Sequence, residues 1–489
     1  MHYVLGIDFG GGASKATLLA QDGTIAAQNT VEYKTSYPKP GYAEQNPMDW
    51  YDAVKKNIAA LLHKSGVLPS SILCVCLDAA THTAVLLDAQ NNVLMPAIYW
   101  TDTRCTAECE TLRKQCGTEI FETALHKVDT IWTLPQLMWI QNNQPDIWRK
   151  TKKILFAKDF VRFLLTEKLY TDRIEAQGSM LYDCRTQVWS ERLCGLLGLD
   201  TNKLPPLLNP LDKAGTITQK AAAETGLIAG TPVICGTTDT ALEVFAAGAV
   251  YEGDMTVKLA TAGRICVITP KPYPDQNLVN YSHILDGLWY PGTATKSCAA
   301  SYRWYRDTFG GDYAALDADA QTVEPGCGGL MFHPYLNGEL TPYADPMLCA
   351  SFTGVRASHK KAHFSRAVLE GVAYSLLACL KSLESLGIQH ADHAVLIGGG
   401  AKSPLWQQIV ADVLGLRLVL TNNSDSSFGG AMLAGVAAGF FACAADAAKS
   451  CVRPLSEIAP NPANTARYQA LYTRYTAIHD ALAPIYHNG

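Results

Sequence analysis

The chain has 489 residues, of which 48% are hydrophobic and 17% charged. This composition supplies enough apolar material for large packed cores and excludes a mostly disordered protein. The net charge of −5 argues against DNA or RNA as the main partner, because binding to a phosphate backbone depends on clustered positive charge. At about 150 residues per domain, the length predicts two or three domains.

The fifteen cysteines are scattered and include no Cys-x-x-Cys pair. Cys105, Cys109 and Cys116 share a helix-like stretch without histidines, so buried thiols are favoured there and metal binding is the minor alternative. An odd count without framework spacing predicts a reducing cytoplasm. The N-terminus shows no basic region or cleavage site, and the weakly apolar run 429–445 is short for a membrane span. We therefore expect no signal peptide, no membrane segment, and a buried helix in that run.

Hydrophobic periodicity and turn residues predict alternating strands and helices in the first part of the chain. The expected strands cover residues 4–7, 16–20, 24–31, 72–77 and 83–87, and a helix covers 50–62. The alternation favours an α/β fold over an all-helical or all-β protein.

The same pattern restarts in the second half. A strand at 232–235, a Gly-Thr-Thr-Asp turn and a helix beginning at 242–247 precede a new strand-turn-strand unit at 255–269. We predict two α/β halves of similar size, residues 1–247 and 248–489. Each is expected to contain a five-stranded mixed sheet, with a cleft between the halves.

A glycine loop follows the strand predicted at 394–397. Gly398, Gly399, Gly400 and Ala401 precede Ser403, a good N-cap, and a helix predicted over 405–414. Such a strand, loop and capped helix let a nucleotide approach the backbone closely. A tight turn that needs positive φ is an equally weighted alternative.

Two aspartates stand where strands end. Asp8 opens the turn Gly10-Gly11-Gly12, where a carboxylate can hold Mg²⁺ beside phosphates bound by backbone N–H groups, and Lys15 follows. Asp239 follows the strand at 232–235, where a base can accept a proton from a hydroxyl nucleophile. The alternatives are a hairpin cap for Asp8, a solvated side chain for Lys15 and a helix N-cap for Asp239.

Two further side chains suit a polyol, and a histidine stands at another strand end. Asp102 and Arg104 lie two residues apart after a strand and can form charge-assisted hydrogen bonds to hydroxyls. An internal ion pair is the alternative. His82 stands between Thr81 and Thr83 near a strand end, where a structural role is the alternative.

These pieces, in order, resemble the FGGY family of carbohydrate kinases, and its xylulokinase branch most closely. The resemblance covers essentially the whole chain. It includes Gly6-Ile7-Asp8-Phe9-Gly10, residues 40–47, Trp100 to Arg104, Lys158-Asp159-Phe160, Ala350-x-Phe352-x-Gly354-Val355, His363-Phe364-x-x-Ala367-Val368-Leu369-Glu370 and Gly398-Gly399-Gly400-Ala401.

The resemblance implies two actin-like, ribonuclease-H-like domains, with the sugar-binding domain first and the ATP-binding domain second. It implies Asp239 as the catalytic base and Asp8 near Mg²⁺ and the transferred phosphoryl group. It places Thr81, His82, Asp102 and Arg104 at the sugar. The nucleotide-side residues that it implies are Thr261, Gly263, Gly399, Gly400, Gly430 and Ala431.

The chain also departs from the family pattern. Ala80-Thr81-His82-Thr83 stands where xylulokinases usually carry Gln-Met-His-Gly, and Leu340 replaces an arginine in Gly338-Glu339-Leu340-Thr341-Pro342. Further departures are Ala260-Thr261-Ala262 for Gly-Thr-Ser, Thr240 for an asparagine and Gln136 for a lysine. These changes affect substrate identity more than reaction type.

We therefore expect a cytoplasmic, ATP- and Mg²⁺-dependent kinase that phosphorylates a ketose, first of all D-xylulose. A kinase for another pentulose, a polyol or a sugar acid such as gluconate is an alternative. So is a non-catalytic, sugar-responsive regulator on the same fold. The expected partners are small molecules, with neither nucleic acid nor membrane, and a homodimer is left open.

Overall fold

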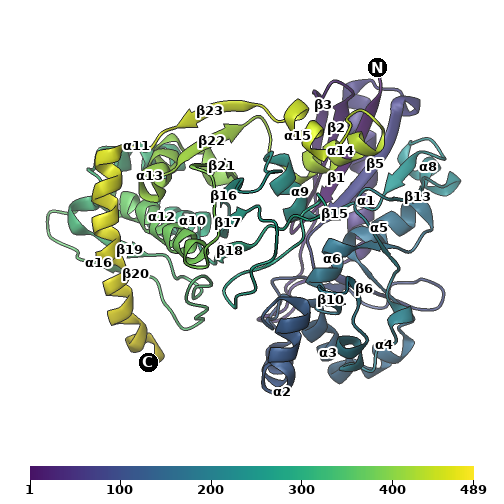
Figure 1. Ribbon diagram of the computed structural model, residues 1–489, viewed down its shortest axis with the longest axis horizontal. Helices are drawn as coiled ribbons and strands as arrows, with labels where there is room; N and C mark the ends of the chain where they lie inside the picture. The colour runs from purple at the N-terminus through teal and green to yellow at the C-terminus, as the bar shows by residue number, and fades with distance from the viewer. Residues whose placement is uncertain (489) are drawn as a thin grey trace. The chain divides into compact units, whose positions relative to one another are not determined.

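In the computed structural model, which describes residues 1–488, the chain forms two compact units (Figure 1). Unit 1 consists of Met1–Val250, Tyr281–Asp286 and Asn423–Val452. Unit 2 consists of Tyr251–Asn280, Gly287–Asn422 and the chain from Arg453. The first passage between the units thus falls at Val250–Tyr251, and two later segments pack in unit 1 although they follow that passage in sequence.

Unit 1 is built on a seven-stranded mixed sheet. Its strand order is β13-β14-β5-β1-β2-β3, with β15 also paired to β5. The strands are β1 (Tyr3–Phe9), β2 (Ala13–Ala20), β3 (Ile25–Glu32), β5 (Ile72–Ala79), β13 (Lys213–Thr216), β14 (Pro232–Ile234) and β15 (Thr237–Thr238). β1 runs antiparallel to β2 and parallel to β5, so the carboxyl ends of β1 and β5 lie at the same edge.

Unit 2 repeats this arrangement in a six-stranded sheet of order β18-β17-β16-β21-β22-β23. The strands are β16 (Met255–Leu259), β17 (Gly263–Val267), β18 (Gly292–Thr295), β21 (His393–Ile397), β22 (Arg417–Thr421) and β23 (Pro454–Ile458). As in unit 1, three antiparallel strands are followed by two parallel ones and an antiparallel edge strand. The strand pattern that restarts in the second half of the sequence therefore reflects a topology shared by the two sheets.

The prediction of five strands per sheet was wrong. The additional strands are short or lie at sheet edges: β15 has two residues, β13 has four, and β23 is exposed along most of its length. Strands of this kind carry no buried apolar run, which is the signal on which the sequence prediction depended.

The two faces of β1 pack against different helices. Leu5, Ile7 and Phe9 belong to the same buried cluster as Trp50 of α1 (Pro47–Ser65). Gly6 alternates with them and contacts α14 (Ser426–Ala437) so closely that a Cβ there would lie 2.0 Å from a backbone oxygen. Because side chains alternate along a strand, Asp8 lies on the same face as Gly6.

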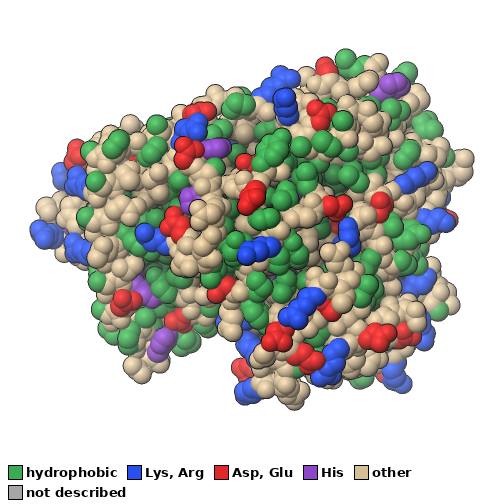
Figure 2. Space-filling model, viewed as in Figure 1, with side chains coloured by type: hydrophobic (Ala, Val, Ile, Leu, Met, Phe, Trp, Pro, Cys, Tyr) green, Lys and Arg blue, Asp and Glu red, His purple; other side chains and the backbone are tan. Residues whose placement is uncertain are grey.

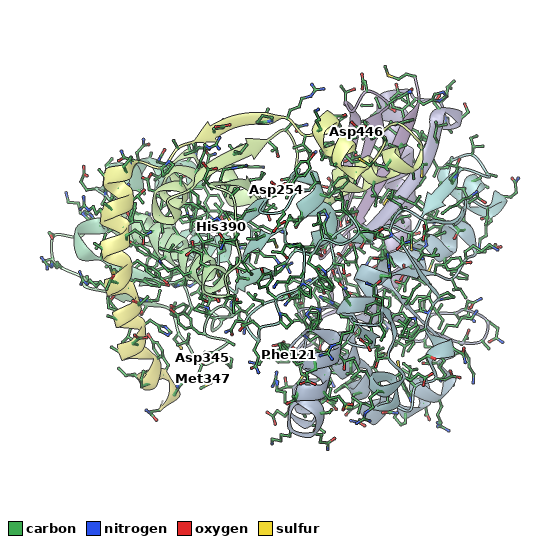
Figure 3. The ribbon with its side chains drawn as sticks, in the orientation of Figure 1. Phe121, Asp254, Asp345, Met347, His390 and Asp446 are labelled. Carbon is green, nitrogen blue, oxygen red and sulfur yellow. The ribbon has the colours of Figure 1, made fainter. Side chains whose placement is uncertain are left out.

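The glycine-rich run 429–445 does form buried helix, but only as far as Ala437. Gly439 has φ of 78°, which ends α14, and α15 (Ala444–Cys451) follows, with Asp446 labelled in Figure 3. A Cβ on Gly429 would lie 2.2 Å from the carbonyl oxygen of Leu242, so α14 also packs tightly on α9 (Asp239–Ala246). Among the described residues, no helix combines the length and apolar character needed to cross a membrane.

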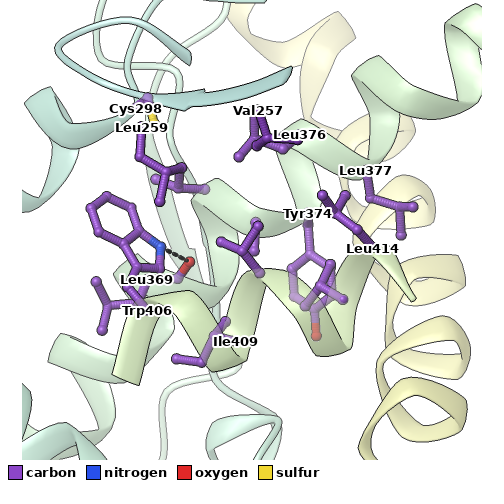
Figure 4. Close-up of a cluster of buried hydrophobic side chains, with 14 of the residues drawn as sticks. Val257, Leu259, Cys298, Leu369, Tyr374, Leu376, Leu377, Trp406, Ile409 and Leu414 are labelled. Atoms are coloured by element: carbon purple, nitrogen blue, oxygen red, sulfur yellow. Dashed lines mark hydrogen bonds between the residues drawn. The ribbon is translucent and has the colours of Figure 1, made fainter. Parts of the chain in front are cut away.

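The core of unit 2 lies around two long helices, α12 (Lys361–Ser385) and α13 (Pro404–Leu414). Figure 4 shows Trp406 among Leu259, Ile409 and Cys298, with its indole N–H donating to the carbonyl of Leu369 at 3.1 Å. This packing fixes the helix that follows the glycine loop.

The other helices of unit 1 are α2 (Thr106–Ala124), α3 (Thr133–Asn143), α4 (Pro145–Lys150), α5 (Ala157–Thr166), α6 (Arg173–Gly178), α7 (Glu191–Gly195) and α8 (Gln219–Thr225). Its small strand pairs are β4 (Glu44–Gln45) with β7 (Ala97–Ile98), β6 (Ala84–Leu87) with β8 (Lys153–Phe156), β9 (Thr171–Asp172) with β12 (Leu207–Leu208), and β10 (Tyr182–Asp183) with β11 (Val188–Trp189). Unit 2 adds α10 (Ala299–Phe309), α11 (Tyr313–Gln321), β19 (Met331–His333), β20 (Ser351–Thr353) and α16 (Pro462–His487).

Two features of the surface complete the description. On the face that Figure 2 draws, basic and acidic side chains are interspersed, in keeping with the small net charge. The end of α16 is fastened to the loop between β19 and β20, where His487 Nε2 donates to Asp345 Oδ2 at 2.6 Å (Asp345 is labelled in Figure 3).

All fifteen cysteines are free thiols, and Cys105 and Cys109 are fully buried. Over residues 1–488, no three His, Cys, Asp or Glu side chains are grouped so that they could hold a metal ion. Cys105 is the N-cap of α2, and Cys109 and Cys116 lie within that helix, where Cys116 is partly exposed.

Candidate active site

Four carboxyl groups gather at one edge of the unit 1 sheet. Asp8 and Asp78 are in register at the ends of β1 and β5, Asp239 is the first residue of α9, and Asp425 is the N-cap of α14. We call Asp8, Asp78, Asp239 and Asp425 the carboxyl cluster. The close packing of α9 and α14 on this face of the sheet brings the starts of both helices to the strand ends.

Burial and neighbouring negative charge favour the protonated forms of Asp8 and Asp78. Burial raises the pKa of Asp8 to about 8, and the charges of Asp425 and Asp239 contribute to that increase. Asp78 is fully buried, and burial followed by the charge of Asp8 raises its pKa well above the usual range. Asp8 and Asp78 occupy paired positions of β1 and β5, so ionisation of Asp8 disfavours ionisation of Asp78.

Lys15 supplies positive charge beside the cluster. Its ammonium group contacts Asp425 Oδ2 at 2.6 Å and is about half exposed. Burial lowers the pKa of Lys15, but the charge and hydrogen bond of Asp425, together with the charges of Asp8 and Glu243, outweigh that effect and raise the pKa above the usual range. The ion pair between Lys15 and Asp425 is therefore partly exposed, and the ammonium group can also contact a phosphate.

The contacts of Asp239 test the alternative that this residue is the N-cap of a helix. The side chain of Thr238 is the N-cap of α9 and accepts from the amide of Ala241. Asp239 Oδ1 instead accepts from the amide of Thr240 at 2.6 Å and from the hydroxyl of Thr81 at 3.3 Å. The carboxylate is therefore not needed to begin the helix.

His82 has a strained backbone whose polar groups are all engaged. Its φ is 72°, which is uncommon for a residue other than glycine. Its N–H donates to Glu175 Oε1 at 3.0 Å, and its carbonyl accepts from the hydroxyl of Thr133 at 2.8 Å. Strain of this kind persists where the surroundings hold it, and it is common at functional sites.

The imidazole ring of His82 is also oriented. Its Nδ1 lies 3.0 Å from the carbonyl oxygen of Gly178, which can only accept, so Nδ1 carries the proton and Nε2 of the neutral ring is an acceptor. Gly178 is necessary here, because a Cβ would lie 2.3 Å from Nδ1. Trp132 packs edge-on against the ring, with centroids 4.6 Å apart.

Asp102 and Arg104 form an internal ion pair, which was the alternative to polyol binding considered from the sequence. Arg104 donates to both oxygens of Asp102 and to Glu44, and Asp102 also accepts from the amide of Ala43 at 2.6 Å. Both side chains are almost fully buried, and the guanidinium stacks on Tyr42 at 3.9 Å. Direct binding of a polyol by this pair stays a prediction, which these contacts do not favour.

The turn formed by Gly10, Gly11 and Gly12 is open. Its carbonyls accept from Tyr33, Thr35 and Gln45, and a Cβ at Gly10 or Gly12 would meet no atom within 4 Å. The chain therefore leaves room for a ligand beside the turn, at the end of the strand that carries Asp8.

Unit 2 contains the two turns expected at the nucleotide. Thr261 is exposed, whereas Gly263 is buried and donates to Thr295 Oγ1 at 3.2 Å. In the loop after β21, Gly398 has φ of 92° and would clash with Leu259 if it had a Cβ. Gly399 is exposed and faces open space, whereas Gly400 packs on Leu259 and Trp406. Ala401 lies in the short 3₁₀ turn Gly399–Lys402.

Gly430 does not share a unit with that loop. It is buried in α14 of unit 1, where a Cβ would lie 3.4 Å from Asp78 Oδ2. Ala431, next to it, lies against Gly6 of β1. Gly430 thus contacts the carboxyl cluster, and its expected position beside adenosine stays a prediction that these contacts do not support.

Sequence reasoning missed Asp78, Glu175 and Asp425. For Asp78 a signal was present, since a carboxylate that ends an otherwise apolar strand is unusual. Glu175 is fully buried, and burial raises its pKa well above the usual range. Its role depends on a contact across 93 residues of sequence, which no local pattern encodes.

Comparison with known proteins matches both parts of the chain to family models. Residues 3–246 match the N-terminal domain of the FGGY family of carbohydrate kinases, and residues 261–438 match the C-terminal domain.

Individual proteins agree with this match. The xylulose kinase of Bacillus subtilis (strain 168) is 31% identical over 98% of this chain and 97% of its own. A crystal structure from Brucella ovis, described as a xyloylose kinase, is 29% identical, with a TM-score of 0.92 over 99% of this chain and 100% of its own. The gluconokinase of Bacillus subtilis (strain 168) is 28% identical over 89% of this chain and 87% of its own.

Proposed function

The chain belongs to the FGGY family of carbohydrate kinases, and we propose that it transfers the γ-phosphoryl group of ATP to the terminal hydroxyl of D-xylulose, giving D-xylulose 5-phosphate. The observation that carries the proposal is Asp239, a carboxylate at the start of a helix that Thr238 already caps. Because Thr238 caps the helix, the carboxylate of Asp239 is not required as a cap. It lies beside three other carboxyl groups and an oriented histidine, and it is suited to accept a proton.

Asp239 acts as the general base on the sugar. The hydroxyl of Thr81 and the amide and hydroxyl of Thr240 all donate to Oδ1 and hold the carboxylate in one orientation, so that it can take the proton of the attacking hydroxyl. His82 accepts a hydrogen bond from another sugar hydroxyl through Nε2. Phosphoryl transfer depends mainly on alignment and charge neutralisation, which both residues serve.

The donor set of unit 1 fits a magnesium ion that is bound together with ATP. Mg²⁺ commonly takes one or two carboxylates and fills its other positions with water and phosphate oxygens. Asp8 provides such a carboxylate, and the absence of a three-residue metal group within residues 1–488 agrees with an ion held partly by the nucleotide. When bound, the ion neutralises charge on the phosphates.

The nucleotide is proposed to contact the chain at glycines that a side chain would obstruct. We propose that the turn Gly10-Gly11-Gly12 and Lys15 of unit 1 bind phosphate oxygens, and Thr261 and Gly263 of unit 2 stay predicted phosphate contacts. The open space at Gly399 supports the loop Gly398–Ala401 as the adenosine contact, with Gly400 and Ala401 fixing its shape. We place the enzyme in the cytoplasm, where fifteen free thiols stay reduced, and its assembly as a homodimer stays a prediction.

Gluconate is the second candidate acceptor. The gluconokinase of Bacillus subtilis matches most of the chain, and Thr81 places a hydroxyl next to the base. Added hydroxyls in a pocket shift discrimination between related substrates by about 1–3 kcal/mol. A non-catalytic, sugar-responsive regulator is the rival from another class, and retention of both Asp8 and Asp239 counts against it.

ADP release measured with a panel of sugars tests the proposal. The purified protein is incubated with Mg-ATP and D-xylulose, D-ribulose, an L-ketulose, glycerol or gluconate, and the phosphorylated product is identified by mass and by its position of phosphorylation. We expect the highest kcat/KM with D-xylulose. A preference for gluconate would move the assignment to the second candidate. Sugar binding without any ADP release would support the regulator.

A further inference from the structure

A six-residue segment of unit 1 comes from the part of the chain that otherwise builds unit 2. Tyr281–Asp286, which we call the strap, is preceded and followed by residues of unit 2, yet it packs with residues 1–250. It contains no helix or strand, only a single bridge residue at Ser282.

The strap is fastened to α6 by a reciprocal pair of hydrogen bonds. The amide of Ser282 donates to Gln177 Oε1 at 2.9 Å, and Gln177 Nε2 donates to the hydroxyl of Ser282 at 2.7 Å. Gln177 is buried, so both ends of its amide are satisfied by one residue of the strap. Next to it, His283 Nε2 donates to the carbonyl of Ala249 at 3.1 Å.

This attachment brings Tyr281 against the imidazole of His82. The hydroxyl of Tyr281 lies 3.4 Å from each ring nitrogen of His82, and the two rings are nearly parallel. The ring of Tyr281 also packs on His126, with centroids 5.1 Å apart, and His126 stacks on Trp132 at 4.3 Å. His126, Trp132 and Tyr281 therefore form an aromatic support around His82.

The strap and Glu175 limit His82 in different ways. Glu175 and Thr133 hold the backbone of His82, and Gly178 orients Nδ1. Tyr281 adds a contact to the imidazole ring itself, with its hydroxyl 3.4 Å from each ring nitrogen. Gln177 holds the segment that carries this tyrosine through Ser282.

We propose that Tyr281 and Gln177 are positioning residues for the sugar, which act through His82: the strap fixes the imidazole so that its Nε2 meets a hydroxyl of the substrate. The inference rests on the proposed function in placing the sugar at His82. It deepens that proposal by assigning part of the substrate specificity to a segment of chain outside residues 1–250.

Two variants and one matched control test the proposal. Tyr281→Phe removes only the hydroxyl, and Gln177→Met removes both hydrogen bonds to Ser282 at similar volume. The control is Tyr51→Phe, which removes a hydroxyl that donates to Glu224 at 2.6 Å elsewhere in unit 1. For each protein, KM is measured for D-xylulose and for ATP, and thermal unfolding is followed without ATP as D-xylulose is added.

We expect both variants to raise KM for D-xylulose by about 3- to 10-fold, the effect of one lost hydrogen bond, while KM for ATP changes less than about twofold. The sugar-dependent increase in unfolding temperature should shrink to match, because ligand stabilisation follows the affinity. The ratio of kcat/KM for D-xylulose to that for gluconate should also change. Tyr51→Phe should alter none of these values.

The proposal is overturned if KM for the sugar and the sugar-dependent stabilisation both stay at wild-type values in the two variants. It is also overturned if KM rises equally for both substrates while the ligand-free protein loses stability, since that is the pattern of a purely structural role. Failure of the proposed function appears separately: the wild-type protein then releases no ADP with any sugar. In that case the sugar-dependent unfolding temperature still tests the role of the strap. If no sugar stabilises the wild-type protein, both the proposed function and the proposed role of the strap are overturned.

Discussion

The hydroxyl of Thr81 donates a hydrogen bond to Oδ1 of Asp239 at 3.3 Å. This bond connects a stretch that departs from the family pattern to the proposed catalytic base. Thr81 belongs to Ala80-Thr81-His82-Thr83, where the sequence departs from the pattern of the xylulokinase branch. The departure from the family pattern therefore includes a residue that contacts the proposed base directly.

Thr81→Val tests this connection, because valine keeps the branched shape and removes the hydroxyl. Asp239 retains its bond from the amide of Thr240, so we expect kcat with D-xylulose to fall by only about 2- to 10-fold. The ratio of kcat/KM values for D-xylulose and gluconate should shift as well. Thr83→Val is the control, since the hydroxyl of Thr83 lies against the carbonyl of Thr81 and does not contact Asp239. Equal effects of the two substitutions would contradict the account.

Gly399→Val tests the nucleotide loop. Nothing lies within 4 Å of a Cβ at this position, so the variant should fold normally and obstruct only a ligand. We expect KM for ATP to rise at least about tenfold while KM for the sugar is nearly unchanged. Gly400→Val should instead destabilise unit 2, because its Cβ would lie 2.8 Å from Leu259 and Trp406.

The control for the loop is Gly195→Val, another exposed glycine with open space around its Cβ, at the end of α7. It should leave both KM values unchanged. A folded Gly399→Val variant with wild-type affinity for ATP would give the loop a purely structural role.

Asp8→Asn tests the metal side of the site. The substitution removes a carboxylate that is suited to Mg²⁺ and leaves His82 and Asp239 in place. We expect the Mg²⁺ concentration needed for half-maximal activity to rise, together with KM for ATP, while binding of D-xylulose measured without ATP is retained. Loss of sugar binding with unchanged dependence on Mg²⁺ would show that Asp8 serves the acceptor instead.

Glu339 predicts a pH dependence of stability. Burial raises its pKa to about 7, although the amides of Lys296 and Leu340 and the hydroxyl of Ser375 donate to it and act in the opposite direction. Because the folded state holds this proton more tightly than the unfolded state, the contribution of Glu339 to the free energy of unfolding decreases as pH rises from about 4.5 to 7.

Glu339→Gln removes that titration. The unfolding temperature of the variant relative to the wild type should therefore increase from pH 4.5 to pH 7.5. The corresponding change in unfolding free energy is at most about 3 kcal/mol, from about 1.4 kcal/mol per pKa unit. Differential scanning calorimetry at several pH values provides the measurement, and a constant difference between the two proteins would contradict the prediction.

Much of the fold follows from local patterns in the sequence. The buried runs at 4–7, 72–77, 255–259 and 394–397 became the central strands β1, β5, β16 and β21, because alternating or continuous apolar residues are what a covered strand requires. Ser403 and Pro404 start α13 as expected, and the Ser403 hydroxyl accepts from the amide of Trp406. The short and exposed strands were missed for lack of such a pattern.

The site was predictable only in part. Asp8, His82 and Asp239 were proposed as site residues from their places at strand ends, and these roles stay predictions. The contacts of His82 with Glu175 and Tyr281 join positions that are 93 and 199 residues away, and only the folded chain brings them together. Gly430 was expected at the adenosine together with Gly399 and Gly400. It lies in unit 1, to which the chain returns at Asn423 without a change in composition, and its place at the adenosine stays a prediction.

Single-turnover phosphoryl transfer by Asp239→Asn is the most direct test of the central claim. Asparagine keeps the size of the side chain and removes the proton acceptor, and Thr238 still caps α9, so the variant should unfold at nearly the wild-type temperature and bind ATP and D-xylulose. The account predicts that the rate of D-xylulose 5-phosphate formation falls by about 10²- to 10⁴-fold, the usual contribution of a positioned base. A folded variant that keeps more than about a tenth of the wild-type rate, well short of that loss, would contradict the assignment of Asp239 as the catalytic base.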